Sequence, residues 1–511
     1  MWETIPGVVR NNGTDTFRIE VNVNGPVSNV TMVVYDNFLT QSGQANITFR
    51  DDGLNGDRIA GDGIYTSEPI RFNTNSDADL PSNYWWDTNS PAGVMPYFPG
   101  NLAIGETNGT VSDFLIRPEI GILDQSIPLV PTVQLSTNVF IAPHLINVMT
   151  TNLYTQKFLR EYPWDAAAVP QVIYSVLPDA FDFFVYFSSY RVEYVPYDTS
   201  YNGVAGAHYS IQINFTGTGQ SKIDNSAACG SAGRLLGVNA LDTYDRGMSA
   251  DICTHEIMHQ WASYLSAFPF SDGQHYVGNC SIGSPLGGGG PWTNNGDGTF
   301  TVTCESLTHL DDLDKYLMGL IATNLVGAVR VYSPTSSVSC GGIISNLIST
   351  TTIQDIVNTY GLRTPGPATA RRNFSIGFVV DSNQRLLTPV EMTYYEIFAR
   401  HYTAPLPTNQ PDPALSYTWT SINHFFGEGT TWSSDVLSLI EPRIQSIQRL
   451  PGQSRIIAQG IGGWNYTLQG STNLQSWSSI TNLTAGTNGV IVATDTSPDS
   501  AYMHFYRLTR P

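Results

Sequence analysis

The chain has 511 residues, of which 41% are hydrophobic and only 13% are charged, so it is long enough for about three domains with substantial cores. Its 43 Asp and Glu residues outnumber its 24 Lys and Arg residues, which gives a formal net charge of −19. This charge argues against nucleic acid as a partner, because phosphate backbones repel an acidic chain. No stretch reaches the ~18 apolar residues of a membrane span.

Residues 1–20 lack the basic start and the apolar segment of a signal peptide. This leaves two interpretations, a cytoplasmic protein or the mature or truncated form of an exported one. Oligomeric state is not indicated by any pattern in the sequence.

Residues 1–125 are predicted to form an all-β domain. The runs Thr16 to Val23 and Asn29 to Tyr35 alternate polar and apolar residues and are rich in β-branched side chains, which is typical of strands. The segment DDGLNGDRIAGDGIYTSE then carries four carboxylates: Asp51, Asp52, Asp57 and Asp62. One interpretation is a structural Ca²⁺ site, because hard cations bind clustered oxygens. The other is that Asp, Asn and Gly only form turns here.

Residues 130–440 contain both helical and strand patterns, which favours an α/β domain with a sheet beside its helices. The helical patterns lie at Leu145 to Tyr162 and at Gln171 to Phe181. Strands are predicted at Asp182 to Val195, Ala207 to Asn214 and Arg234 to Asp242. We expect the last of these to offer an edge to which an extended peptide can pair.

The central motif is His255-Glu256-Ile257-Met258-His259. On a helix, residues four apart lie on the same face, so the two imidazoles can bind one Zn²⁺ ion. Glu256 lies between them as a general base for a metal-activated water. We predict a helix from Met248 to Phe268, because no Gly or Pro interrupts it before Pro269.

A catalytic zinc site usually needs a third protein ligand. Ala262 and Leu265 stand where the metzincin pattern needs Gly and His, and no Glu lies between Gln260 and Cys304 for the thermolysin pattern. His275 is the preferred candidate, because a loop with Gly and Asp can return it to the helix. The alternatives are Asp314, Glu305 and His309, near an apolar pattern that runs from Leu307 to Leu320.

Five cysteines lie in the central part of the chain, and none forms a C-x-x-C pair. A cysteine-based zinc finger is therefore not expected. We expect a disulfide between Cys280 and Cys304, which bracket a Gly-rich loop. The alternative is that all five cysteines are small buried residues.

Residues 441–511 return to strand patterns, at Trp464 to Gly470, Gly489 to Thr494 and Phe505 to Leu508. This tail resembles a small C-terminal β-domain found on exported bacterial proteins. Residues 51–68 likewise resemble a segment of Ig-like domains at the front of such proteins. Both resemblances imply export or surface display.

Residues 130–405 resemble a family of exported bacterial proteins in the zincin metallopeptidase superfamily. The resemblance lies in the segment His255 to Trp261, in His275, in the loop with Trp292 and Asn295 to Gly298, and in Leu313 to Leu320. It implies a zincin-like catalytic domain, zinc, and hydrolysis, with His255, His259 and His275 as ligands and Glu256 as base.

The sequence therefore predicts a multidomain α+β protein, with a zincin-like domain (130–440) between an Ig-like β-sandwich (1–125) and a small C-terminal β-sandwich (441–511). The expected function is a secreted zinc endopeptidase acting on peptides or proteins. Two alternatives stay open: an inactive binding or adhesion protein that keeps the zincin fold, and a zinc hydrolase of a non-protein amide.

Overall fold

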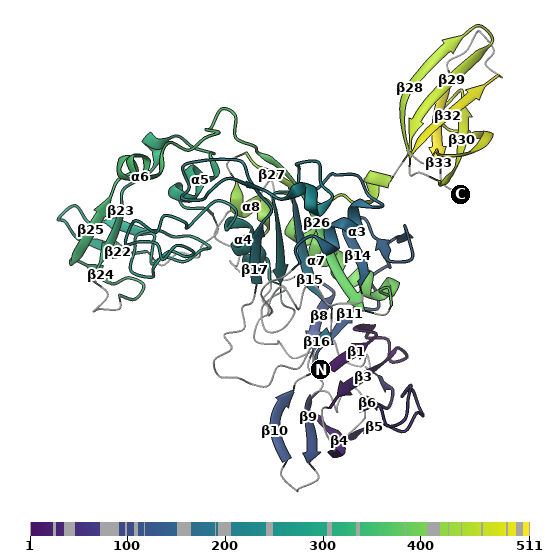
Figure 1. Ribbon diagram of the computed structural model, residues 1–511, viewed down its shortest axis with the longest axis horizontal. Coiled ribbons are helices and arrows are strands. Elements are labelled where there is room, and N and C mark those ends of the chain that lie inside the picture. Colours follow the sequence, from purple (N-terminus) through teal and green to yellow (C-terminus); the bar gives the residue numbers. More distant parts are fainter. Residues whose placement is uncertain are drawn as a thin grey trace. The chain divides into compact units, whose positions relative to one another are not determined.

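The computed structural model divides the chain into two compact units (Figure 1). The first comprises residues 1–175 and 179–434, and the second comprises residues 176–178 and 435–511. The structure describes residues 2–23, 27–34, 46–71, 91–97, 100–106, 111–116, 118–150, 165–189, 191–192, 206–241, 249–303, 309–333, 338–383, 385–405, 420–427, 429–440, 442–460, 463–486, 489–496 and 504–509. In these ranges the chain is multidomain, mixed α/β and rich in strands, as predicted. None of their helices is long and apolar enough to cross a membrane.

The N-terminal strands form a nine-stranded sheet in the order β10-β9-β4-β5-β6-β3-β1-β16, with β7 beside β3. Neighbouring strands in it are antiparallel. The strands are β1 (Trp2–Ile5), β3 (Thr16–Asn22), β4 (Val27–Val34), β5 (Asn46–Arg50), β6 (Ile64–Ser67), β7 (Ile70–Arg71), β9 (Gly100–Glu106), β10 (Val111–Ile116) and β16 (Arg191–Val192). Burial alternates along β3, so Phe17, Ile19 and Val21 face one apolar core.

A smaller sheet connects these strands to the rest of the first unit. It consists of β2 (Val8–Arg10), β11 (Ile120–Leu123) and β8 (Val94–Tyr97), and β2 and β11 lie against helix α7 (Pro389–Tyr402). The backbone N–H of Gly7 donates a 2.7 Å hydrogen bond to Glu391 on that helix. The predicted N-terminal domain and the predicted catalytic domain therefore lie within one compact unit.

The centre of the first unit is a mixed sheet in the order β12-β13-β14-β26-β15-β20-β17, with β27 beside β26. Its strands are β12 (Val133–Gln134), β13 (Val139–Ile141), β14 (Leu145–Thr150), β15 (Phe183–Ser188), β17 (Gly206–Ser210), β20 (Gly237–Leu241), β26 (Asn373–Asn383) and β27 (Thr431–Ser433). The four strands β14, β26, β15 and β20 are parallel, whereas β17 is antiparallel to β20.

Two expectations about this sheet are wrong. The helical pattern from Leu145 to Tyr162 begins as strand β14, and residues 151–164 lie outside the described residues. A short apolar run that is buried in a parallel sheet looks like a buried helix, because it has no clear period. The strand predicted at Arg234 to Asp242 is present as β20, but it is no edge, since β15 and β17 pair with its two sides. Among the described strands, β17 ends the sheet.

The described helices are α3 (Ala168–Tyr174), α4 (Ala250–Met258), α5 (Asp312–Met318), α6 (Ile353–Tyr360), α7 and α8 (Ile422–Phe426), with 3₁₀ turns η2 (Ser226–Cys229), η3 (Thr323–Leu325) and η6 (Leu437–Ile440). The pattern predicted at Gln171 to Phe181 corresponds to α3, which ends earlier. In α5, Leu313 and Leu317 are fully buried, so the apolar pattern there is a core face.

Small sheets complete the first unit: β18 (Gln212–Ile213) with β19 (Ile223–Asp224), β21 (Trp292–Asn294) with β22 (Phe300–Val302) and β24 (Ile343–Ile344), and β23 (Val329–Tyr332) with β25 (Leu347–Thr351).

The second unit contains two three-stranded antiparallel sheets, β28-β29-β32 and β31-β30-β33. Their strands are β28 (Arg443–Leu450), β29 (Gln453–Gln459), β30 (Asn465–Ser471), β31 (Ser478–Thr484), β32 (Val490–Asp495) and β33 (Phe505–Thr509). Tyr466 and Leu468 on β30 and Ile456 on β29 are fully buried between apolar neighbours. The strand pattern of the tail thus predicts its described structure.

The cysteines differ from the expected pairing. Cys280 is a free, buried thiol, as are Cys229 and Cys253, so the predicted Cys280–Cys304 disulfide is wrong. The backbone of Cys280 bridges to Val331, and its side chain is part of the large apolar core. Cys340 is disulfide-bonded, and Cys304 lies outside the described residues.

The acidic loop of the N-terminal region brings the carboxylates of Asp51, Asp57 and Asp62 within 4.8 Å of one another. The Asp51 carboxylate accepts the backbone N–H groups of Gly61, Asp62 and Gly63. Asp57 accepts the N–H of Gly53, and Asp52 accepts that of Leu54. These contacts are the ones expected of Asp in turns, and a Ca²⁺ site here stays a prediction.

Candidate metal centre

Helix α4 carries the central motif and ends sooner than predicted. It begins after Ser249, whose backbone is extended, and its last helical residue is Met258, so that His259 is the C-cap. The carbonyl of His259 accepts a 2.8 Å hydrogen bond from the Tyr264 hydroxyl, and that of Gln260 accepts one from Gln220. Side chains thus satisfy carbonyl groups that a longer helix would have paired. The predicted extension to Phe268 is therefore wrong.

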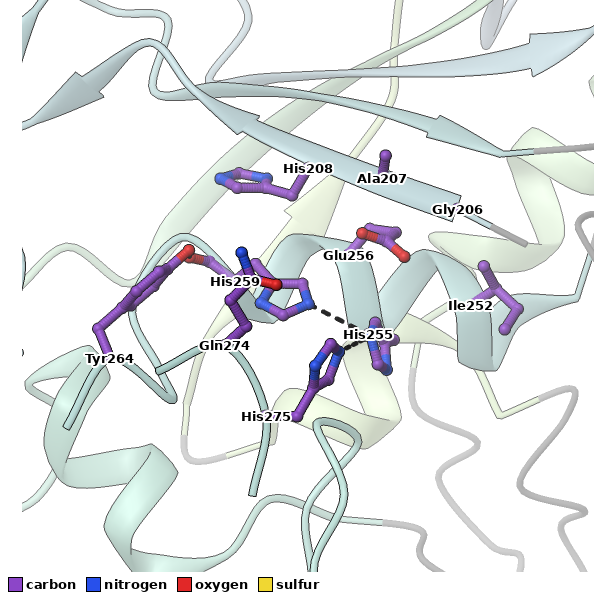
Figure 2. Close-up of a pocket in the computed structure, with 10 residues that line it drawn as sticks. All are labelled: Gly206, Ala207, His208, Ile252, His255, Glu256, His259, Tyr264, Gln274 and His275. Atoms are coloured by element: carbon purple, nitrogen blue, oxygen red, sulfur yellow. Dashed lines mark hydrogen bonds between the residues drawn. The ribbon is translucent and has the colours of Figure 1, made fainter. Parts of the chain in front are cut away.

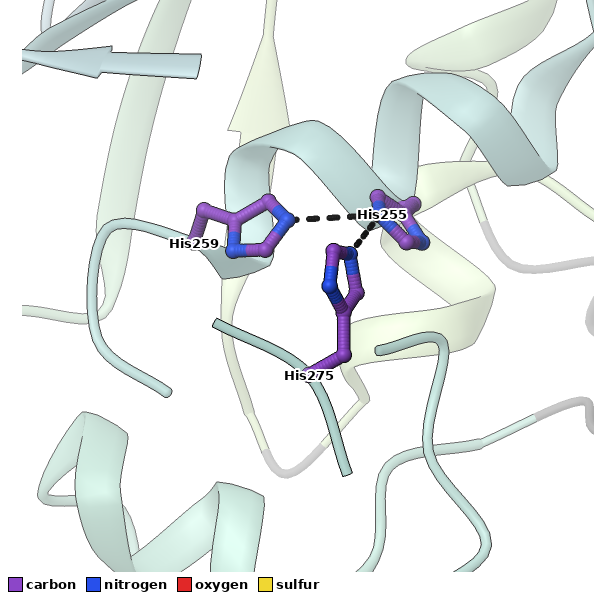
Figure 3. A group of neighbouring side chains, drawn as sticks. All are labelled: His255, His259 and His275. Atoms are coloured by element: carbon purple, nitrogen blue, oxygen red, sulfur yellow. Dashed lines mark hydrogen bonds between the residues drawn. The ribbon is translucent and has the colours of Figure 1, made fainter. Parts of the chain in front are cut away.

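His255, His259 and His275 converge at one point (Figure 3). The Nε2 atom of His255 lies 3.3 Å from Nε2 of His259 and 3.3 Å from Nε2 of His275. The ligand atoms of all three lie within 4.8 Å of one another. Nitrogen atoms bound to a tetrahedral zinc ion at ~2.0–2.1 Å are roughly 3.3–3.4 Å apart, so the donor set and the spacing fit zinc.

A loop after α4 holds His275 in this position. Asp272 accepts the backbone N–H groups of Gln274 and His275, at 2.8 and 2.6 Å, which fixes the turn. The N–H of the next residue, Tyr276, donates to the carbonyl of Leu286. In the same segment, the carbonyl of Pro285 accepts a 2.7 Å hydrogen bond from Nδ1 of His255. This bond leaves the lone pair of Nε2 for an ion, as in many metal sites.

The structure brings His275 to the motif. None of the alternative ligands among the described residues lies there. Asp314 is fully buried and hydrogen-bonds to Tyr276 and Ser284, and it does not belong to the histidine cluster. His309 is exposed and also lies outside the cluster. Glu305 lies outside the described residues.

No family model, curated protein or solved structure matches this chain.

The three histidines line a cavity of about 420 Å³ (Figure 2). Its other lining residues are Gly206, Ala207, His208, Ile252, Glu256, Tyr264 and Gln274. The first three come from β17, so the last of the described strands of the mixed sheet runs along the cavity. The cavity therefore combines a histidine cluster that could hold a metal ion, one carboxyl group and the last described strand of the sheet.

Burial sets the protonation of these groups. Together with the neighbouring histidines, it lowers the pKa of His255 to about 4 and that of His259 to about 2. Both imidazoles are therefore neutral at pH 7, the form that binds metal. Burial also raises the pKa of Glu256 to about 8. A carboxyl group with a pKa near neutral can both accept and release a proton.

The sequence did not indicate two polar residues of the cavity. His208 on β17 hydrogen-bonds with Asn239 at 2.8 Å and with Ser210 at 3.0 Å, and burial lowers its pKa to about 4. The number of residues between His208 and the motif does not indicate that they are neighbours, because His208 lies on a strand and the motif on a helix. Tyr264 is one of 26 tyrosines in the chain, and the early end of α4 brings its hydroxyl to the carbonyl of His259.

Proposed function

We propose that this chain is a zinc-dependent hydrolase that cleaves peptide bonds, with His255, His259 and His275 as zinc ligands and Glu256 as general base. The observation that supports this most directly is the convergence of three histidine side chains, with Nε2 of His255 3.3 Å from Nε2 of each of the other two, beside the buried Glu256. A zincin-like fold of the central domain belongs to the same proposal.

When bound, a zinc ion supplies a Lewis acid that polarises a carbonyl group and makes a water molecule acidic near neutral pH. Glu256 accepts one proton from the attacking water and delivers it to the nitrogen of the leaving amine. The new C–O bond forms as the C–N bond breaks, so each peptide consumes one water. Tyr264 and His208 line the cavity and are the donors available to the oxygen that gains charge.

The choice of a peptide as substrate rests on strand β17. It pairs with β20 on one side and is the last described strand of the sheet. An extended peptide can pair with such an edge through its backbone, and the first three residues of β17 would bring it into the cavity. A protein or peptide is therefore the proposed partner.

We also propose that the protein is secreted or displayed at the cell surface. The disulfide at Cys340 supports this, because disulfides persist mainly in oxidising compartments. The resemblances of residues 51–68 and of the tail to segments of exported proteins agree with it. The formal net charge of −19 continues to argue against nucleic acid as a partner.

Metal content and hydrolysis test the proposal together. The purified chain should hold about one zinc per molecule, and His255→Ala should lose it because that variant lacks one ligand. Hydrolysis of casein-derived peptides should stop with a chelator and recover with added zinc. Full zinc occupancy in His255→Ala would contradict the assignment of the ligands. Zinc binding without any turnover would favour the adhesion protein, and turnover of a cell-wall amide alone would favour the other hydrolase.

A further inference from the structure

The start of strand β17 passes directly over Glu256 (Figure 2). A Cβ atom at Gly206 would lie 2.6 Å from Oε1 of Glu256, 2.7 Å from its Cγ and 2.9 Å from its Cδ. Carbon atoms in contact are normally 3.5–4.0 Å apart, so even the smallest side chain at residue 206 would occupy the space of the carboxylate.

The backbone of Gly206 does not itself require glycine, because its φ lies outside the left-handed region. Alanine would therefore be compatible with the strand, and only the space above Glu256 excludes it. The overlap involves Cγ as well as the terminal oxygen, so a rotation of the carboxylate group alone does not remove it. Glu256 is 5% exposed, and α4 packs against β17 and β20, which restricts how far the helix can move.

We infer that Gly206 is a positioning residue for the proposed reaction: its missing side chain leaves the space in which Glu256 faces the histidine-lined cavity. This inference rests on the proposed function, since it concerns the placement of the general base. No described protein group hydrogen-bonds to the Glu256 carboxylate, so steric contact, with Gly206 on one side, defines its position. Gly206→Ala should move the carboxylate away from the attacking water while leaving all three zinc ligands in place.

The first test compares turnover. Gly206→Ala should keep about one zinc per chain and lower kcat on casein-derived peptides by about 10–100-fold, with KM changed less than about threefold, because misplacement by ~1 Å can have such an effect. In a Glu256→Gln background, the same substitution should cause no further loss. An additive loss in that background, or wild-type kcat in Gly206→Ala, would show that Gly206 does not act through Glu256.

The second test needs neither metal nor turnover. In the metal-free chain, Gly206→Ala should lower the Tm by on the order of 2–5 °C, the effect of overpacking in a domain of this size. In a Glu256→Ala background it should cause no decrease, because the overlapping atoms are gone. Equal decreases in both backgrounds would overturn the inference.

Gly377→Ala in β26 is the matched control. A Cβ there would lie 2.7 Å from the ring of Phe184. Strand β26 is separated from β17, the strand above Glu256, by β15 and β20. It should lower the Tm equally with and without the Glu256 side chain, and it should leave kcat of the folded protein within about twofold. A wild-type chain without zinc-dependent turnover would overturn the proposed function and this inference with it, whereas unchanged kcat in Gly206→Ala overturns the inference alone.

Discussion

The hydroxyl of Tyr276 donates a 2.9 Å hydrogen bond to Oδ1 of Asp314, and both side chains are buried. Burial, with a smaller contribution from the nearby Asp311, raises the pKa of Asp314 to about 7. Tyr276 follows His275 directly in the chain, so this bond anchors the loop that carries the third histidine to helix α5.

Tyr276→Phe should therefore weaken both the fold and the metal site. It removes one of the donors to the buried Asp314 carboxyl group, which costs about 1–3 kcal/mol of unfolding free energy. We expect zinc affinity to fall about tenfold, at the lower end of the effect of outer-shell partners. Competition with a chelating dye measures it. Tyr506→Phe, which breaks a 3.0 Å bond to Asp495 in the second unit, is the control and should bind zinc normally.

Glu256→Gln tests whether Glu256 acts as the general base and not as a zinc ligand. The amide has nearly the same shape but cannot accept a proton, so turnover should fall by ~10²–10⁴-fold while zinc content stays at the wild-type value. Glu396→Gln is a matched control, because Glu396 is also a buried carboxyl group whose pKa is raised, to about 7, by burial. If Glu256→Gln cleaves every substrate of the wild type at the normal rate, the mechanism is wrong.

His275→Ala should lower zinc affinity and turnover together, since it removes one of three converging donors. A water molecule can replace the imidazole, but we expect at least a tenfold loss of affinity, comparable to the loss of an outer-shell partner. Isothermal titration of the metal-free variant with zinc measures it. Wild-type affinity in this variant would show that the third ligand lies elsewhere, with Glu305, which lies outside the described residues, as the next candidate.

His255 should make the metal-free protein less stable as the pH falls below about 6.5. An unfolded histidine has its ordinary pKa of 6.5, whereas burial lowers that of folded His255 to about 4. Between these values the unfolded chain binds a proton that the folded chain does not, so acid favours unfolding. Above pH 6.5 both states have a neutral imidazole and the effect disappears.

Replacing that histidine isolates its share of the pH dependence. His255→Asn should lose less stability than the wild type between pH 7 and pH 4.5, by on the order of 2 kcal/mol. Urea unfolding of chelator-treated samples at the two pH values gives the difference. Parallel losses in the two proteins would show that the imidazole is not held neutral by the fold.

Removing residues 435–511 should leave zinc binding and hydrolysis largely intact. The described residues that line the cavity all belong to the first unit, and the second unit has its own apolar cores. The truncated chain should have kcat and zinc content within about twofold of the full chain, by the same peptide assay and elemental analysis. Loss of zinc on truncation would assign the tail a part in the site.

The sequence predicts those parts of the site that depend on local spacing. His255, Glu256 and His259 follow from one helical turn, and His275 follows from a short loop that returns to the helix. The strands at Thr16 to Val23 and in the tail follow from period-two burial. These features need only near neighbours in the chain, and the structure brings the three histidines together as this spacing predicts.

The features that escape prediction depend on partners far away in the chain. Strand β17 contributes Gly206 and His208 because the sheet places it beside α4, and no local pattern carries that information. The end of α4 after Met258 depends on Tyr264 and Gln220, whose side chains pair with the next carbonyls. Cys280 is a free thiol in a core that contains residues from many elements. The loop between Cys280 and Cys304 therefore does not indicate whether the two form a disulfide.

Strand β26 has a consequence for how the protein is made. It is inserted between β14 and β15, although it follows both in the chain by the whole segment that carries the histidines. A ribosome must therefore complete residue 383 before the two halves of the sheet can join. Until then the side of β15 that pairs with β26 is an open strand edge, and open apolar edges in partly folded chains are prone to aggregation.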